Sequence, residues 1–127
     1  MKKKIMVVDD EPDVTYTIEL NLKMFDKDYE ITRVSSGEQC LELLKNGESP
    51  DLILLDIMMP GMSGEETYEK IRENPSWKGI PVVFLTAKVD EFSGEHTTHL
   101  GEEYIEKPYD PTELRDRLQK ILTKSRA

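Results

Sequence analysis

Five short apolar segments that alternate with amphipathic segments constrain the fold of this chain more than any other feature. The apolar segments are rich in β-branched residues or alternate between apolar and polar residues, and they span residues 4–9, 29–34, 51–56, 80–86 and 103–106. The segments that follow them have helical spacing or helix caps, and they span residues 12–24, 36–46, 65–73, 90–100 and 111–122. Strands that alternate with helices through short connections are typical of a parallel sheet covered by helices.

The third apolar segment indicates where the centre of this sheet lies. Its sequence, DLILLD at residues 51–56, is continuously apolar between acidic ends, as expected for a strand buried on both faces. Right-handed crossovers around such a central strand favour a doubly wound sheet. We therefore predict a three-layer α/β fold of the flavodoxin-like (βα)5 type, with a parallel five-stranded sheet in the order 2-1-3-4-5.

Cap residues and helix breakers define the predicted helices. Pro12 suits a first helical turn, and Ser36 and Asp110 are typical cap residues before two of the other helices. The segment 90–100 contains Gly94, and a glycine inside a helix costs about 1 kcal/mol relative to alanine. We therefore predict that this helix is short or mobile.

Composition limits the class of protein. At 127 residues the chain fits one domain, and we expect residues 1–127 to form a single one. No apolar run approaches the ~20 residues of a membrane span, and the basic start precedes too few apolar residues for a signal peptide, so we expect a cytoplasmic protein. The net charge of −9 disfavours direct nucleic-acid binding by this domain and favours protein partners and a metal cation. The single cysteine, Cys40, is predicted to be a small buried hydrophobic residue.

Polar side chains stand where four of the predicted strands end. Asp9 and Asp10 follow the first strand, Asp56 closes the third, Thr86 closes the fourth, and Lys107 follows the fifth. The carboxyl ends of parallel strands meet at one edge of the sheet, where open α/β sheets bind their ligands. Each residue alone could be a cap or a turn residue. Together, at the ends of separate strands, they predict one functional pocket.

The chemistry of this pocket follows from its residue types. Three carboxylates repel one another, which raises the pKa of at least one of them unless a cation joins them. Oxygen ligands with no cysteine or histidine nearby suit a hard ion, so we predict Mg²⁺, for which Mn²⁺ could substitute. Acids, a metal, a hydroxyl and a lysine fit phosphoryl transfer, in which the transferring oxygens need neutralising from several directions. Asp56 is the candidate nucleophile.

Four stretches make the pattern specific. They are VVDDEP at residues 7–12, LLDIMMPGMSG at 54–64, LTA at 85–87 and YIEKP at 104–108. Together they resemble the receiver domains of two-component response regulators, such as chemotaxis regulators, and the resemblance covers essentially the whole chain.

The resemblance implies a phosphoacceptor signalling protein and not an enzyme, with at most weak self-phosphorylation from small donors and autodephosphorylation. It implies that Asp56 receives a phosphoryl group from a sensor histidine kinase or a phosphotransfer protein. It also implies that Asp10, Asp56 and the backbone carbonyl of Met58 hold Mg²⁺, while Asp9 acts largely through water.

The resemblance further implies a switch. The Thr86 hydroxyl should grip the phosphoryl group, Lys107 should pair with it, and Tyr104 should turn inward behind Thr86. The surface formed by residues 90–100, residues 103–106 and the last helix would then change, biasing an existing equilibrium. A downstream protein target or an attached output domain would read that surface.

Three other classes of protein share parts of this pattern. A pseudo-receiver that binds partners without phosphorylation stays open, although every functional position is filled. A haloacid-dehalogenase-like phosphatase also uses a strand-end aspartate, but it needs a second aspartate two residues later, where this chain has Met58. A flavodoxin-like cofactor binder needs a phosphate loop after the first strand, where Asp9, Asp10 and Glu11 would repel a flavin phosphate.

Weaker signals concern the second half of the chain. Residues 101–103 read Gly-Glu-Glu, where receiver domains often have Gly-Ala-Asp. His96 and His99 are predicted to face solvent and not to bind a metal. Trp77 is predicted to pack against the third helix. Lys88, together with Met58, is expected to influence how quickly water reaches the acyl phosphate.

Overall fold

The sheet forms the centre of the molecule. The computed structural model describes residues 2–86, 103–107 and 109–125. Five parallel strands run in the order β2-β1-β3-β4-β5, as predicted. The strands are β1 (Lys3–Val8), β2 (Tyr29–Val34), β3 (Leu52–Asp56), β4 (Val82–Thr86) and β5 (Glu103–Glu106).

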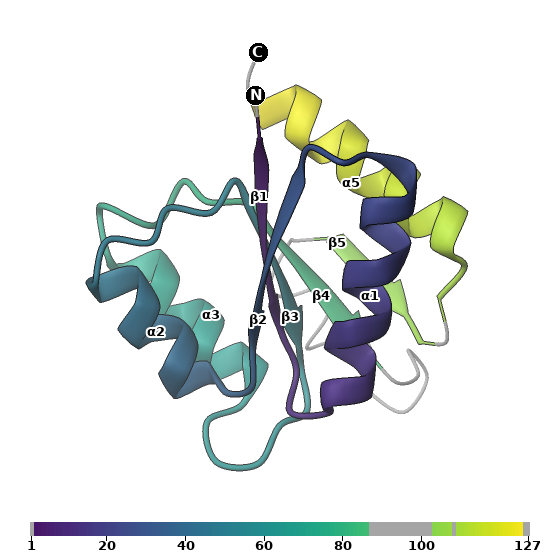
Figure 1. Ribbon diagram of the computed structural model, residues 1–127. Coiled ribbons are helices and arrows are strands. Elements are labelled where there is room, and N and C mark those ends of the chain that lie inside the picture. The colour runs from purple at the N-terminus through teal and green to yellow at the C-terminus, as the bar shows by residue number, and fades with distance from the viewer. Residues whose placement is uncertain (1, 87–102, 108, 126–127) are drawn as a thin grey trace.

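Four helices cover this sheet among the residues described. They are α1 (Pro12–Phe25), α2 (Gly37–Lys45), α3 (Gly64–Glu73) and α5 (Pro111–Ser125). Figure 1 shows α1 and α5 on one side of the sheet and α2 and α3 on the other, which gives the predicted three layers. The helix predicted at residues 90–100, with His96 and His99, lies outside the described residues, as do Lys88 and residues 101–102.

The core consists of two apolar layers, one on each face of the sheet. Every residue of β3 is buried, as the sequence of this strand predicted. Ile53 and Leu55 belong to the cluster covered by α2 and α3, whereas Leu52 and Leu54 belong to the cluster covered by α1 and α5. Because successive side chains of a strand point to opposite faces, one continuous apolar segment supplies both layers.

Local hydrogen bonds explain where the helices begin. Ser36 caps α2 by accepting a hydrogen bond from the backbone N–H of Gln39, and the Asp110 carboxylate accepts one from the N–H of Thr112 before the first turn of α5. At α1 the cap position belongs to Glu11, whose side chain makes no capping bond. The Asp9 carboxylate instead accepts the Glu11 N–H at 2.9 Å.

The strand β4 begins later than predicted. We predicted a strand over residues 80–86, but Ile80 donates its N–H to the carbonyl of Trp77 in a turn, and the strand starts at Val82. Pro81 lies between them and has no N–H to give to a ladder. Trp77 packs against the apolar layer that includes Tyr68 of α3, in agreement with its predicted role.

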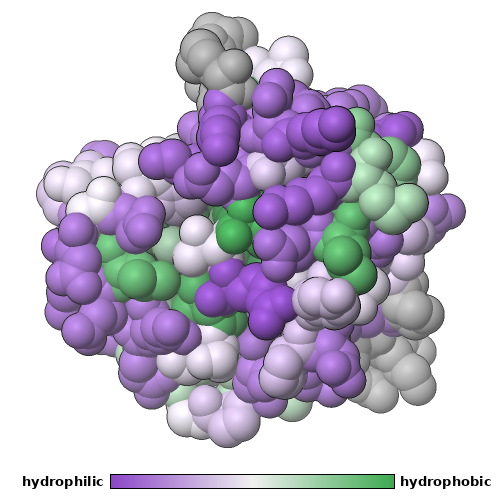
Figure 2. Space-filling view, viewed as in Figure 1, coloured by the Kyte–Doolittle hydropathy of each residue, from purple (hydrophilic) through white to green (hydrophobic). Residues whose placement is uncertain are grey.

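The surface is mainly hydrophilic, with smaller hydrophobic areas over α1 and beside α2 (Figure 2). On α1 the large apolar side chains Leu20, Met24 and Phe25 are exposed. None of the described helices is long and apolar enough to cross a membrane.

Candidate functional site at the carboxyl edge of the sheet

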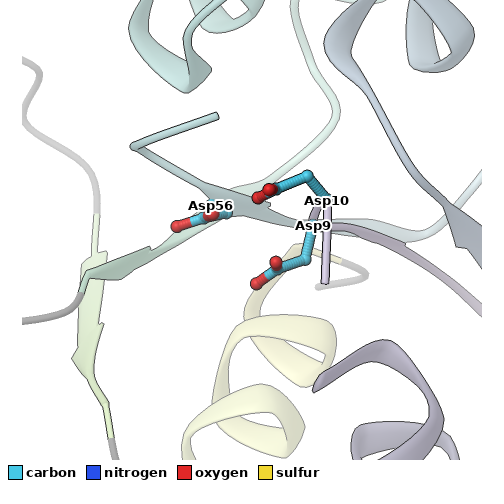
Figure 3. Close-up of side chains that lie close together, drawn as sticks. All are labelled: Asp9, Asp10 and Asp56. Carbon is cyan, nitrogen blue, oxygen red and sulfur yellow. The ribbon is translucent and has the colours of Figure 1, made fainter. Parts of the chain in front are cut away.

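Three carboxylates meet where β1 and β3 end. Asp9 and Asp10 directly follow β1, and Asp56 is the last residue of β3, the strand paired with β1. Each offers an oxygen within 4.8 Å of the others, and Figure 3 shows the side chains grouped at this edge. Asp9 and Asp56 are 1% and 5% exposed, whereas Asp10 is exposed. The pairing of β1 with β3 therefore creates the predicted acidic cluster.

Lys107 reaches this cluster from β5. Its backbone N–H donates to the carbonyl of Thr86 at 2.7 Å. This hydrogen bond continues the β4-β5 pairing and positions the Lys107 backbone at the edge of the sheet. Its Nζ donates to Asp9 Oδ2 at 2.8 Å and lies 3.5 Å from Asp56 Oδ1. The ammonium group therefore sits between two buried carboxylates, closer to Asp9.

The electrostatics of the cluster follow from burial and repulsion. Burial first, and then the neighbouring Asp9 carboxylate, raise the pKa of Asp56 to about 6. Lys107 offsets part of this rise, and Asp10 adds to it. Burial disfavours the charge of Lys107, but its hydrogen bond to Asp9 and the nearby carboxylates raise its pKa overall. Additional positive charge at this edge would therefore favour the ionised form of Asp56.

These residues fit a hard divalent cation. The donor set is three carboxylates, and with the Lys107 ammonium the ionised cluster carries a combined charge of −2. Carboxylate oxygens suit Mg²⁺, which keeps several of its own waters and needs few protein ligands. The site therefore has both the ligand type and the charge that Mg²⁺ requires.

Replacing Asp10 with asparagine should weaken Mg²⁺ binding by roughly tenfold or more, because one of three clustered carboxylates is lost. Asp10 is exposed, so the change leaves the core intact. Binding can be followed as the rise in thermal unfolding temperature with Mg²⁺ concentration. The matched control is Glu42→Gln, which removes the same charge from an exposed position on α2 and should leave the rise unchanged. An equal rise in unfolding temperature with Mg²⁺ in both variants would show that Asp10 does not contribute to Mg²⁺ binding.

The loop after β3 is held tightly against the site. The backbone N–H of Gly64, at the start of α3, donates to the carbonyl of Ile57 at 2.9 Å. Ser63 and Glu66 form a capping box, with the Ser63 hydroxyl accepting the Glu66 N–H and the Glu66 carboxylate accepting the Ser63 N–H. This capping box was not among the predicted helix caps, although the spacing Ser-x-x-Glu at residues 63–66 was a signal for it.

The other predicted site residues lie at or near the same edge. Thr86 ends β4 and is buried, next to β3 and Asp56. The backbone N–H of Met58 hydrogen-bonds to Asp56, while the Met58 side chain is 64% exposed. Tyr104 is half-buried and stacks on Phe84, which precedes Thr86 by two residues on β4. The structure thus brings Asp9, Asp10, Asp56 and Lys107 into one cluster and places Tyr104 farther along the sheet.

Cys40 plays no part in this cluster. Its thiol is fully buried, 3.7 Å from the sulfur of Met6, and burial raises its pKa to about 12. Cys40 is thus the buried apolar residue that the sequence predicted, and its thiol stays protonated at neutral pH.

Comparison with known families shows the family to which this chain belongs. The model of the response regulator receiver domain family matches residues 5–119, which include every residue of the cluster. The chain is a response regulator receiver domain. Receiver domains are the phosphoacceptor switches of two-component systems, generally signalling proteins and not enzymes, and they typically use Mg²⁺ and interact with histidine kinases or phosphotransfer proteins.

Relatives of this receiver domain include several longer proteins. The alkaline phosphatase synthesis transcriptional regulatory protein PhoP of Bacillus subtilis is 36% identical over 98% of this chain and 50% of its own length. A probable transcriptional regulator, ycf27, of Guillardia theta is 34% identical over 98% of the chain and 47% of its own length. The receiver domain spans about half the length of the curated relatives that it matches.

Solved structures share the fold of this receiver domain. A response regulator from Chloroflexus aurantiacus is 31% identical, with a TM-score of 0.87 over 97% of this chain and 99% of that one. A CheY-like receiver domain protein from Methanospirillum hungatei has a TM-score of 0.86 over 99% and 98% of the two chains. Its 24% identity supports the shared fold alone.

Proposed function

We propose that this receiver domain accepts a phosphoryl group on Asp56 and transmits the change to a protein partner. The observation that carries the proposal is the burial of Asp56 beside Asp9, Asp10 and Lys107. We further propose that residues 1–127 form a single cytoplasmic domain whose phosphodonor is a sensor histidine kinase or a phosphotransfer protein.

The transfer step needs a free carboxylate oxygen. One Asp56 oxygen attacks phosphorus, a P–O bond forms as the P–N bond of a phosphohistidine donor breaks, and the imidazole nitrogen keeps the electron pair of that bond. Asp56 must be ionised to attack, and a pKa of about 6 leaves it mostly ionised at neutral pH. Asp10, Asp56 and the Met58 carbonyl would hold Mg²⁺, with Asp9 acting largely through water, and the bound ion would supply positive charge for the transferring oxygens.

Lys107 and Thr86 are proposed to hold the product. Lys107 Nζ already lies 3.5 Å from Asp56 Oδ1, so it can pair with an added phosphoryl oxygen after a small shift. Thr86 lies at the end of the neighbouring strand, with a hydroxyl that can donate a hydrogen bond. The acyl phosphate adds roughly one to two negative charges, which makes both interactions favourable.

The switch and its output are proposed on the same basis. When Thr86 moves toward the phosphoryl group, Tyr104 is proposed to move behind it, and the surface formed by residues 90–100, β5 and α5 changes. A downstream protein target or an attached output domain reads this surface. With a net charge of −9, the domain itself is not expected to bind nucleic acid.

Hydrolysis of the acyl phosphate is proposed to be slow. A haloacid-dehalogenase-like phosphatase has a second acid two residues after its nucleophile, and this position is Met58 here. Without a general acid or base at that position, water attacks with little assistance. We propose at most weak self-phosphorylation from small donors and weak autodephosphorylation, as befits a switch.

Incubation with acetyl phosphate and Mg²⁺ should add one phosphate to the native domain and none to Asp56→Asn, because asparagine cannot form an acyl phosphate. Intact-protein mass spectrometry measures the adduct, and hydroxylamine should remove it. Glu69→Gln, an exposed change of the same size on α3, is the control and should label like the native domain. A folded native domain that never acquires the adduct would point to a binding module that works without phosphorylation.

A further inference from the structure

Phe84 of β4 stacks against Tyr104 of β5, the residue that the proposed function moves. The ring centroids lie 5.4 Å apart, with their planes inclined by 17°. The strand register explains this contact, because Phe84 pairs with Tyr104 in the β4-β5 ladder and both side chains project from the same face of the sheet. Phe84 is fully buried, whereas Tyr104 is only half-buried.

The Phe84 ring is also held from the side of α3. Tyr68 of α3 meets it edge-on, with centroids 5.3 Å apart and planes at 61°. The Arg72 guanidinium lies 4.7 Å from the centroid of the Tyr68 ring and donates a hydrogen bond to the carbonyl of Ile80 at 2.9 Å. Phe84 is thereby fixed by α3 and by the turn before β4, whereas Tyr104 is the less buried ring of the Phe84-Tyr104 stack.

The position of Thr86 relative to this stack determines whether the stack favours or opposes the movement of Tyr104. Thr86 follows Phe84 by two residues on β4, so both side chains project from the same face, with Thr86 nearer the acidic edge. A Tyr104 ring that moves behind Thr86 must leave its stacked position on Phe84. The stack therefore stabilises one conformation of Tyr104 and not the other, which is the condition for biasing an equilibrium.

We propose that Phe84 is a positioning residue for the switch: its stacking with Tyr104 opposes the switched conformation and sets how readily the domain adopts it. This inference rests on the proposed function. An aromatic pair typically changes an equilibrium constant by about 2- to 10-fold beyond its buried area. By linkage, removing the stack increases the affinity for a phosphoryl mimic by up to the same factor.

The test compares Phe84→Leu with the native domain. Leucine keeps an apolar side chain in the core but cannot stack. Two readouts are taken: the NMR signal of the ¹³C-labelled Tyr104 ring, assigned by its loss in Tyr104→Phe, and the affinity for beryllofluoride in the presence of Mg²⁺. In Phe84→Leu, the Tyr104 signal should lose the ring-current shift caused by Phe84, and beryllofluoride should bind about 2- to 10-fold more tightly.

A matched control separates stacking from loss of core packing. Leu44→Val of α2 changes a buried residue of the same apolar layer outside the aromatic stack. It should lower stability without changing the Tyr104 signal or the beryllofluoride affinity. If Phe84→Leu does not fold, Phe84→Met carries the same test.

Two outcomes would overturn the inference. One is a folded Phe84→Leu domain whose beryllofluoride affinity is unchanged or weaker. The other is a Tyr104 signal that is the same with and without the Phe84 ring. Should the native domain bind no beryllofluoride and gain no phosphate, the proposed function fails, and the Tyr104 signal without the mimic still decides whether Phe84 positions this ring.

Discussion

Replacing Gly64 with alanine should lower the free energy of unfolding by about 3 kcal/mol, because the space for a methyl group is already filled by backbone. A Cβ atom at residue 64 would overlap the carbonyl oxygen of Asp56 and lie 2.8 Å from the Cα of Ile57. These atoms belong to the last residue of β3 and to the residue that follows it, and they cannot shift without moving Asp56, the candidate phosphoacceptor. The same close approach lets the Gly64 N–H reach the Ile57 carbonyl, which anchors α3 to the sheet.

Gly79 provides the control for this prediction. A Cβ atom built there meets no other atom within 4 Å, so Gly79→Ala should change the unfolding free energy by no more than about 0.5 kcal/mol. Urea unfolding of the three proteins measures the difference. Equal midpoints for Gly64→Ala and the native domain would mean that the β3-α3 junction yields more easily than its geometry implies.

Replacing Asp56 with asparagine should stabilise the metal-free domain at neutral pH by about 2 to 3 kcal/mol. The pKa of Asp56 is raised from 3.8 to about 6 in the folded protein. Between these values the folded state binds more protons than the unfolded state, so the free energy of unfolding falls as pH rises. Above about pH 6, Asp56 is ionised in both states and the full loss of unfolding free energy is present. Asparagine removes this loss because it carries no charge.

The measurement is urea unfolding in a chelating buffer across the range from about pH 4 to pH 7. The native domain should lose stability over this range relative to Asp56→Asn. The exposed Glu69→Gln variant should follow the native domain. Parallel curves for the native domain and Asp56→Asn would show that the acidic cluster does not strain the fold. Adding Mg²⁺ should stabilise the native domain more than Asp56→Asn, because the ion neutralises the repulsion.

Most of the fold could be predicted because hydrophobic pattern and turn chemistry agree along the chain. The strand order follows from the central position of β3, whose residues are all buried, and the bounds of β2 and β5 are those predicted. The start of β4 was wrong by two residues. Periodicity alone could not show that the Ile80 N–H bonds to Trp77 in a turn and not to a neighbouring strand.

The candidate site was predictable as a set of residues but not as a geometry. Parallel strands bring Asp9, Asp56 and Lys107 to one edge whatever their side chains do. That Lys107 lies 2.8 Å from Asp9 and 3.5 Å from Asp56 depends on rotamers and on contacts between residues 98 positions apart. The Phe84-Tyr104 stack depends on the register of β4 with β5, which no local pattern of either strand specifies.

Asp56, and not Asp9 or Asp10, is proposed to be the carboxylate that accepts the phosphoryl group. The most direct test is to phosphorylate the native domain with acetyl phosphate and Mg²⁺, reduce the acyl phosphate with borohydride, and map the product by peptide mass spectrometry. Reduction converts a phosphorylated aspartate into homoserine, so homoserine should be found at residue 56 and at neither Asp9 nor Asp10. Homoserine at residue 9 or 10, with residue 56 unchanged, would show that Asp56 is not the phosphoacceptor.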